Sequence, residues 1–247
     1  MNTNTGSPRG TERKIAITAG ALFIIATAAS IAGSSLTGPI LGAPDYLSRI
    51  SSNGNRVMVG ALLSFIAAAA SSSIAISLYP LLKKYNEGLA LGAVGFRLIE
   101  GVFYIVGAVC VLPLFTLSQQ FVTAGGQGAS YFQTAGNLLL TTRDSAGFVF
   151  GVIAFCLGAL MYTYIFYRSN LIPRWLSVWG FMAIVLLLST VVVILFGGGP
   201  FSVSGNLIFL ALPIALQEMV LAVWLIVKGF NPSAIAPNPA RQPSLEV

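Results

Sequence analysis

Six apolar stretches of membrane-spanning length dominate the sequence, and they constrain the fold more than any other feature. They cover residues 15–36, 57–82, 89–117, 146–167, 175–196 and 206–227. A helix that crosses the hydrocarbon core of a bilayer needs about 20 predominantly apolar residues. Inside lipid the backbone must satisfy its own hydrogen bonds, which a helix does within one segment. The sequence therefore predicts an all-α membrane protein that folds as a six-transmembrane-helix bundle.

The composition agrees with a membrane protein and argues against several classes of function. Hydrophobic residues make up 56% of the chain and charged residues only 8%, whereas soluble domains average about 25% charged residues. The basic residues lie in short groups beside the apolar stretches, so nucleic acid is not an expected partner despite the net charge of +6. There is no His, and Cys110 and Cys156 lie inside apolar stretches, as packing residues do. We therefore expect neither a bound metal nor another cofactor.

Polar segments at both ends frame a single domain. Residues 1–13 are polar, contain Gly and Pro, and are predicted to be a disordered cytoplasmic tail. Residues 14–230 form the predicted six-helix transmembrane domain. Residues 231–247 are rich in Pro and are predicted to be a flexible cytoplasmic tail.

Two connections between the apolar stretches have features of their own. Residues 45–54 would place Tyr46, Leu47 and Ile50 on one face of a short interfacial helix that ends near the Asn-Gly pair. Residues 118–144 form the longest connection and are rich in Gln, Gly, Ser and Thr. We expect this connection to be a loop with a short helix that lies on the membrane surface or covers a cavity.

The distribution of Lys and Arg predicts which side of the membrane each end faces. With six spans, one side of the membrane holds nine of these residues and the opposite side holds three. The nine are Arg9, Arg13, Lys14, Lys83, Lys84, Arg168, Arg174, Lys228 and Arg241, and the three are Arg49, Arg56 and Arg143. Because cytoplasmic loops carry the excess of basic residues, both termini are predicted to be cytoplasmic, in a protein of the plasma membrane.

Three charged residues lie deep within the predicted spans, Arg97 and Glu100 in the third and Glu218 in the sixth. Arg97 lies ten residues after Glu87, and Glu218 lies ten residues before Lys228. At about 1.5 Å per residue, both are about 15 Å from the cytoplasmic ends of their helices. Arg97 and Glu100 share a helix face because they are three residues apart. We expect Glu218 to turn toward that face, so that Arg97 bridges the two carboxylates, which can share a proton.

Polar residues on other spans reach the same depth and complete the candidate site. The candidate ligand-binding or buried polar residues are Arg97, Glu100, Glu218, Gln217, Ser71, Ser72, Ser73 and Tyr162. Ionisable groups inside a membrane usually face the protein interior and often mark functional sites. Polar pairs between membrane helices can also serve only to hold the helices together. The cluster is therefore either structural or part of a site.

Three classes of function are compatible with the sequence. The first is a non-enzymatic membrane protein whose cluster is structural or lines a pocket for a small apolar or lipid-like ligand. It is favoured because the chain has no catalytic motif and short cytoplasmic loops. The second is a secondary transporter or proton-coupled carrier, which the charges at one depth and Pro213 would suit. The third is a membrane-embedded enzyme on a lipid or isoprenoid substrate, with a Glu as general acid. In each class the lipid bilayer is a partner.

Four segments of the sequence resemble a widespread bacterial family. They are DYLSRISSNGNRVMVGALL at 45–63, YPLLKKYNEGLALGAVGFRLIEG at 79–101, LIPRWLSVWG at 171–180 and ALPIALQEMVLAVWLIVKGF at 211–230. From about residue 15 to residue 230 the chain is similar to six-span membrane proteins of the DUF4386 type, a family of unknown function. The most recognisable positions are Arg97, Glu100, Pro213, Glu218 and Trp224. The resemblance implies the fold and the membrane location and leaves the activity open.

Overall fold

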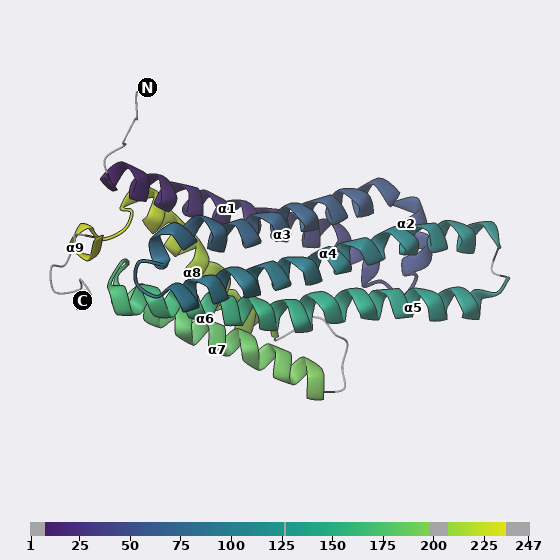
Figure 1. Ribbon diagram of the computed structural model, residues 1–247. Coiled ribbons are helices and arrows are strands. Elements are labelled where there is room, and N and C mark those ends of the chain that lie inside the picture. Colours follow the sequence, from purple (N-terminus) through teal and green to yellow (C-terminus); the bar gives the residue numbers. More distant parts are fainter. Residues whose placement is uncertain (1–7, 126, 198–206, 236–247) are drawn as a thin grey trace, which may run out of the picture.

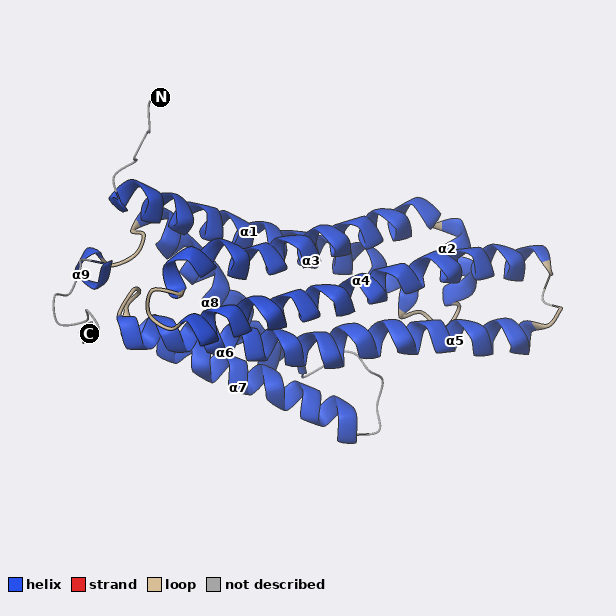
Figure 2. Ribbon diagram, in the orientation of Figure 1, coloured by secondary structure: helices blue, strands red, loops and turns tan. Residues whose placement is uncertain are grey.

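The computed structural model describes residues 8–125, 127–197 and 207–235, and every regular element within these residues is a helix (Figure 2). The elements are α1 (Pro8–Leu41), α2 (Tyr46–Ser52), α3 (Gly54–Leu82), α4 (Glu87–Thr123), α5 (Ala129–Ser145), η1 (Ala146–Gly151), α6 (Val152–Ser169), α7 (Arg174–Phe196), α8 (Ile208–Val227) and α9 (Pro232–Ile235). When α5, η1 and α6 are taken as one continuous helix, six helices are long and apolar enough to cross a membrane. The predicted all-α architecture is confirmed, with six helices of membrane-spanning length and hydropathy.

The first helix starts earlier than the sequence predicts. α1 begins at Pro8, so residues 8–13 form its first turns instead of a disordered tail. Glu12 pairs with Lys84, with 3.2 Å between Oε1 and Nζ. The Arg13 guanidinium donates to the carbonyl of Leu225 near the end of α8, at 3.3 Å. Cations satisfy the carbonyls that a helix leaves unpaired at its C-terminus, and these contacts hold the start of α1 in place. Residues 1–7 lie outside the described residues.

The segment 118–144 differs most from the prediction, because it is helical over most of its length. α4 continues to Thr123, a short turn follows, and α5 begins at Ala129. In the turn, Gly128 has a φ of 67°, a left-handed conformation that glycine adopts without steric cost. The helix then passes through η1, a π-helical turn, directly into α6. The long loop of the prediction is therefore replaced by a helical hairpin.

The polar side chains that suggested a loop are accommodated on this hairpin. Thr134 donates to the carbonyl of Ser130 at 2.9 Å, and Thr142 donates to the carbonyl of Leu138 at 2.8 Å. Hydroxyl side chains bonded to the carbonyl four residues earlier are compatible with a helix, although their intrinsic preference is for turns. Their composition alone was therefore misleading.

The helices form an elongated bundle whose described chain ends lie together. α1 packs against α3, α3 against α4, α4 against α6 and α6 against α7, while α8 packs against both α7 and α1. The start of α1 and the short helix α9 lie at one end of the bundle, on the left of Figure 1, and α2 and the α4–α5 turn lie at the other. α7 and α8, with 23 and 20 residues, stop well before that second end (Figure 1).

Beyond the ends of α7 and α8, the other helices form a small structure that we call the outer cap. It consists of the end of α1, α2, the start of α3, the end of α4 and most of α5. The outer cap has its own hydrophobic core, formed by Ile40, Leu41, Tyr46, Leu47, Ile50, Val57, Val111 and Leu114. With 37 residues, α4 is about 55 Å long, which exceeds the hydrocarbon core of a bilayer at about 30 Å. The outer cap is the part that accounts for this excess length.

The short helix predicted at residues 45–54 is present as α2. Tyr46, Leu47 and Ile50 are buried on one of its faces, as predicted. This face packs into the core of the outer cap, and the Tyr46 hydroxyl donates to Asn137 Oδ1 on α5 at 3.0 Å. α2 therefore connects the two sides of the outer cap.

The first residues of the predicted C-terminal tail are ordered against the bundle. The Asn231 N–H donates to the Leu171 carbonyl at 2.8 Å, and the Tyr85 hydroxyl donates to the Ala234 carbonyl at 3.0 Å. These contacts place α9 beside the α3–α4 and α6–α7 turns. Residues 236–247 of the predicted tail lie outside the described residues.

Candidate functional site

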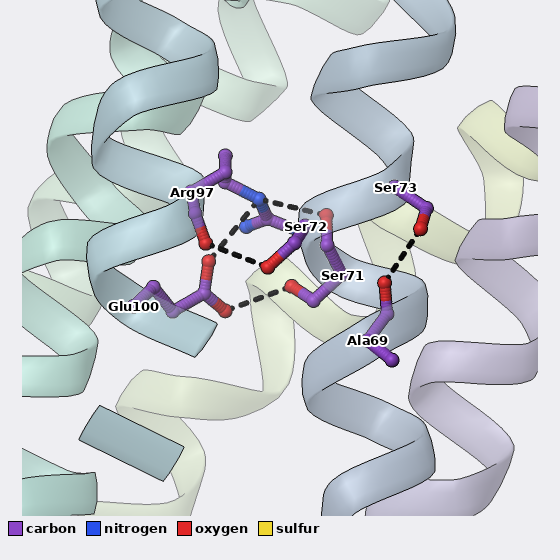
Figure 3. A network of polar contacts seen from close by, with 6 residues as sticks. All are labelled: Ala69, Ser71, Ser72, Ser73, Arg97 and Glu100. Carbon is purple, nitrogen blue, oxygen red and sulfur yellow. Dashed lines mark hydrogen bonds and ion pairs between the residues drawn. The ribbon is translucent and has the colours of Figure 1, made fainter. Parts of the chain in front are cut away.

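Arg97 and Glu100 form an ion pair in the middle of the bundle (Figure 3). Their Nε and Oε2 atoms are 3.1 Å apart, and the two side chains are 1% and 2% exposed. Both residues lie on α4, where a spacing of three puts them on one face. Ser71 of α3 donates its hydroxyl to Glu100 Oε1 at 2.8 Å, and its carbonyl accepts from Arg97 Nε at 3.3 Å. One residue of α3 therefore contacts both charges.

Helix α6 supplies further contacts to Arg97. The guanidinium carbon lies 4.6 Å from the centroid of the Phe155 ring, a favourable cation–π distance. Gly158, three residues further along α6, faces the aliphatic part of the same side chain. A Cβ atom at this position would lie 3.0 Å from Arg97 Cγ and 3.1 Å from Cδ. The glycine therefore provides the room in which the arginine side chain lies.

The three consecutive serines of α3 have different contacts. Ser71 contacts the ion pair, and Ser72 donates to the Arg97 carbonyl at 3.0 Å. Ser73 instead donates to the carbonyl of Ala69 in its own helix at 2.7 Å, and Figure 3 shows it pointing away from the ion pair. Successive residues of a helix point about 100° apart, so a run of three cannot face one site. The structure therefore brings Ser71 and Ser72 to the cluster and leaves Ser73 outside it.

Glu218 of α8 lies near the ion pair, but Arg97 does not bridge it to Glu100. Among the described residues the Glu218 carboxylate forms no ion pair, although the guanidinium attracts it electrostatically. The Nε atom of Arg97 is already occupied by Glu100 and the Ser71 carbonyl. Buried Glu218 Oε1 and buried Arg97 Nη1 both lack a hydrogen-bond partner in the described part of the chain, and so does Glu100 Oε2 apart from its ion-pair contact with Arg97 Nε.

Arg97, Glu100 and Glu218 all line a cavity of about 390 Å³. Its walls come from α1, α3, α4, η1, α6, α7 and α8, with Arg143 at the end of α5. Along α4 the lining extends from Arg97 to Val111, a distance of about 21 Å at about 1.5 Å per residue. The cavity therefore extends from the ion pair toward the outer cap, and its volume is in the range of about 300–1,000 Å³ that is usual for small-molecule sites.

Gln217 and Tyr162 lie outside this cavity. Gln217 is 4% exposed, and its Nε2 donates to the Leu176 carbonyl at 3.3 Å, which joins α8 to α7. Tyr162 packs edge-on against Phe23, with 6.5 Å between the ring centroids. Neither residue is part of the cavity lining. Depth along a helix placed both residues near the cluster. Gln217 instead faces α7, whereas Tyr162 lies close enough to Arg97 to interact with its charge but packs against Phe23 outside the cavity.

Much of the cavity wall was not predicted from the sequence. Thr27, Ser30 and Ser34 of α1 line the cavity, and Thr37 continues this row toward the outer cap. Their spacing of three and four residues puts the four hydroxyls on one helix face. This periodicity within an apolar stretch is the signal that identifies them. Tyr104, one turn beyond the ion pair on α4, was missed although it has the same spacing.

A comparison with known protein families gives a match that includes all of the described site. A family model described as "Domain of unknown function (DUF4386)" matches residues 18–229. The match confirms the family resemblance seen in the sequence and includes the ion pair, Glu218 and the cavity. No curated protein and no solved structure matches the chain. Among the described residues, no group of three His, Cys, Asp or Glu side chains is placed to hold a metal ion.

Proposed function

Because the chain belongs to the DUF4386 family, whose description assigns no activity, we propose a function from the cavity: the protein binds a small ligand between its membrane helices without transforming it. One observation carries this proposal. Arg97 and Glu218, of opposite charge, both line the same cavity, and each has a buried atom without a hydrogen-bond partner among the described residues.

The unpartnered atoms favour a binding site over a purely structural clamp. A buried polar group without a hydrogen bond costs about 1–3 kcal/mol, and more when it is charged. A clamp would satisfy Arg97 Nη1 and Glu218 Oε1 by pairing them with each other, yet the two are not paired. A ligand that accepts a hydrogen bond from Arg97 and donates one to Glu218 satisfies both. Glu100 is already engaged by Arg97 and Ser71, so the geometry supports binding of a ligand at the remaining groups of Arg97 and Glu218.

Thiol accessibility tests whether a small molecule reaches this cavity. Glu218→Cys is made in a background in which Cys110 and Cys156 are replaced by Ala, and the folded protein is treated with N-ethylmaleimide. We expect the Glu218→Cys variant to react. Gln217→Cys is the matched control, because Gln217 is adjacent in sequence, buried and outside the cavity. An unreactive Glu218→Cys variant, or equal reaction of the two variants, would contradict the proposal, provided that both elute as folded protein.

A secondary transporter or proton-coupled carrier is the second candidate. It is favoured by the unpaired carboxylate of Glu218 at mid-span and by Pro213, which lies inside the same helix and removes a backbone hydrogen bond. In this function Glu218 would carry the coupled proton. Uptake into proteoliposomes driven by a pH gradient would then be lost in Glu218→Gln. Binding without any uptake would rule out this candidate.

We also propose that both termini face the cytoplasm and that the membrane is the plasma membrane of a bacterial cell. The described chain ends lie at one end of the bundle (Figure 1). The turns at this end carry Lys83, Lys84, Arg168 and Arg174, whereas the outer cap carries fewer basic residues. An excess of basic residues on the cytoplasmic side supports this orientation, and the bacterial assignment rests on the family resemblance.

A further inference from the structure

We propose that the cavity opens sideways into the bilayer between α1 and α8, and that its ligand is a membrane-dissolved amphiphile with an uncharged head group. The head group both donates and accepts hydrogen bonds. This inference rests on the proposed ligand-binding function and adds to it the entry route and the chemical class of the ligand.

Helices α1 and α8 are in close contact in one half of the bundle and apart in the other. At Gly20 a Cβ atom would lie 2.7 Å from the Ala222 carbonyl oxygen, so the two backbones nearly touch there. The two helices are antiparallel. Seven residues further toward the outer cap, Thr27 of α1 and Ala215 of α8 therefore lie at the same level of the bundle. Both of these residues line the cavity. Figure 1 shows α8 slanting away from α1 in this direction. The cavity therefore begins where the two helices separate.

The exposed residues of the lining mark the mouth of the cavity. Among the lining residues that the structure describes, the exposed ones are Ser30, Ile31 and Ser34, and all of them lie on α1. Ile31 is 59% exposed. Helix α7 contributes Leu187 to the opposite wall and packs against α6 and α8 rather than against α1. The mouth is therefore on the α1 side, between α1 and α8.

This mouth faces hydrocarbon. Ile31 lies in the candidate span Gly10–Leu41, and the lining residues of α8 lie in the candidate span Phe209–Val227. An opening between two spans at this depth is bordered by lipid tails, where an exposed isoleucine is stable. A molecule that enters there arrives from the bilayer, so most of it must be apolar. The walls offer such a molecule an apolar side formed by Phe155, Leu187 and Ile214.

The unpartnered atoms of Arg97 and Glu218, at the end of the cavity that we call its deep end, determine which head groups can bind. Arg97 Nη1 can only donate hydrogen bonds, and an ionised Glu218 Oε1 can only accept them. An ammonium group would satisfy Glu218 alone, and a carboxylate or phosphate would satisfy Arg97 alone. A hydroxyl or a primary amide can satisfy both atoms. The deep end also holds two carboxyl groups and one guanidinium, so a further anion would be repelled. The ligand is therefore an uncharged amphiphile such as a long-chain alcohol or amide.

Photolabelling in proteoliposomes tests the route and the head group together. The probes are a long-chain alcohol and the fatty acid of equal length, each with a diazirine at the same position of the chain. The full-length protein is irradiated with each probe, and labelled residues are mapped by mass spectrometry. We expect the alcohol to label Glu218 and Tyr104, which line the cavity. The fatty acid is expected to label only residues on the lipid-facing surface.

Two variants of α1 test the mouth directly. Ile31→Trp places a large side chain at the mouth, and we expect it to abolish labelling of Glu218 and Tyr104 by the alcohol. Ile25→Trp is the control, because Ile25 is 46% exposed on the same helix but does not line the cavity. It is expected to retain the labelling. Both changes are on an exposed surface, so both variants are expected to fold, which size-exclusion chromatography checks.

The outcomes separate this inference from the proposed function. Cavity labelling that persists in Ile31→Trp overturns the route between α1 and α8, and equal labelling of the cavity by alcohol and acid overturns the head-group class. If neither probe labels the cavity while the Glu218→Cys variant reacts with N-ethylmaleimide, ligand binding stands and entry from the bilayer is wrong. If neither probe labels and the variant is unreactive, the proposed function itself is contradicted.

Discussion

Individual groups on three helices hold Arg97 in place. Its charge is opposed by Glu100 on α4, its Nε also donates to the Ser71 carbonyl on α3, and its guanidinium lies over the Phe155 ring on α6. A fully buried cation is tolerated only while its partners remain, because removal of one partner leaves an uncompensated charge away from water. The partners of Arg97 are therefore the most sensitive positions of the site.

Glu100→Gln tests this sensitivity. The change keeps the shape of the side chain and removes its charge, so Arg97 is left buried without its counterion. Breaking a buried ion pair from one side costs about 3–5 kcal/mol, and we expect a loss of this size in the free energy of unfolding. SDS titration followed by tryptophan fluorescence measures it. Glu87→Gln removes the same charge from an exposed site on the same helix and is expected to cost less than about 1 kcal/mol. Similar losses in the two variants would show that the pair is not buried as described.

Ser71→Ala and Ser73→Ala separate two serines that the sequence places side by side. Ser71→Ala removes the hydrogen bond from α3 to Glu100. Polar contacts between membrane helices contribute about 0.6 kcal/mol on average and up to about 1.7 kcal/mol, and we expect a loss in this range. Among the described residues Ser73 bonds only within its own helix, so Ser73→Ala is expected to leave stability nearly unchanged. The same SDS titration compares them, and a larger loss for Ser73→Ala would contradict the arrangement in Figure 3.

At the scale of the helices, α4 and α6 approach each other where α6 lacks a side chain. The Cβ that Gly158 does not have would also lie 3.3 Å from the Ala93 carbonyl oxygen of α4. The same glycine therefore sets both the spacing of the helices and the space for Arg97. Interiors are packed closely enough that one added methyl group at such a position must displace its neighbours.

Gly158→Ala is expected to destabilise the protein because of this close approach. Overpacking of a tight interior typically costs about 1–3 kcal/mol, and the thermal unfolding midpoint in detergent should fall accordingly. Gly95→Ala is the matched control on α4, because a Cβ there would meet no atom within 4 Å. The control is expected to be neutral or slightly stabilising, by up to about 1 kcal/mol, because alanine favours a helix. Equal effects at the two positions would mean that propensity outweighs packing at this contact.

The positions of the spans could be predicted from the sequence, whereas the full extent of the helices could not. The apolar stretches predict the spans because their length matches the bilayer. Outside the bilayer, apolar composition no longer indicates where a helix continues. The polar residues 118–144 have the composition of a loop. Their helical state follows from the packing of α5 against α4 and the core of the outer cap. Tertiary contacts of this kind outweigh the weak local preferences of Ser, Thr and Gln.

At the scale of the whole molecule, the bundle has two different ends. The basic turns and the start of α1 lie at one end, and the outer cap lies at the other. The proposed orientation puts the basic turns in the cytoplasm and the outer cap outside the cell. Six spans require that the α3–α4 turn and the α4–α5 turn face opposite sides of the membrane.

Lys83→Cys and Gln127→Cys test this orientation in a background without Cys110 and Cys156. Both positions are exposed, one in the α3–α4 turn and the other in the α4–α5 turn. On intact cells a membrane-impermeant maleimide is expected to label only Gln127→Cys, and on inside-out vesicles only Lys83→Cys. The reverse pattern would invert the orientation. Labelling of both variants from the same side would contradict the six-span fold.

Part of the candidate site could be predicted from the sequence, because contacts within one helix follow from residue spacing. Contacts between helices also depend on how each helix is rotated about its axis. Arg97 and Glu100 pair because their spacing on one helix is independent of tertiary structure. Glu218 and Gln217 were placed by depth alone, and depth does not specify how a helix is rotated about its axis. In the structure that rotation brings Glu218 to the cavity and Gln217 to α7. Cavity walls built from several helices depend on all of these rotations at once.

The continuous helix formed by α5, η1 and α6 limits how the protein can change length. Each residue added to a helix rotates everything beyond it by about 100°. One residue inserted within Ala129–Ser145 would therefore turn the packing face of the outer cap away from α4, while Phe155 stayed in place. A change in the length of the outer cap that keeps these contacts must therefore add or remove whole turns, matched on α4 and α5. A π-helical turn already accommodates one extra residue, so Ala146–Gly151 is where the loss of one residue can be absorbed by a return to regular α-helix.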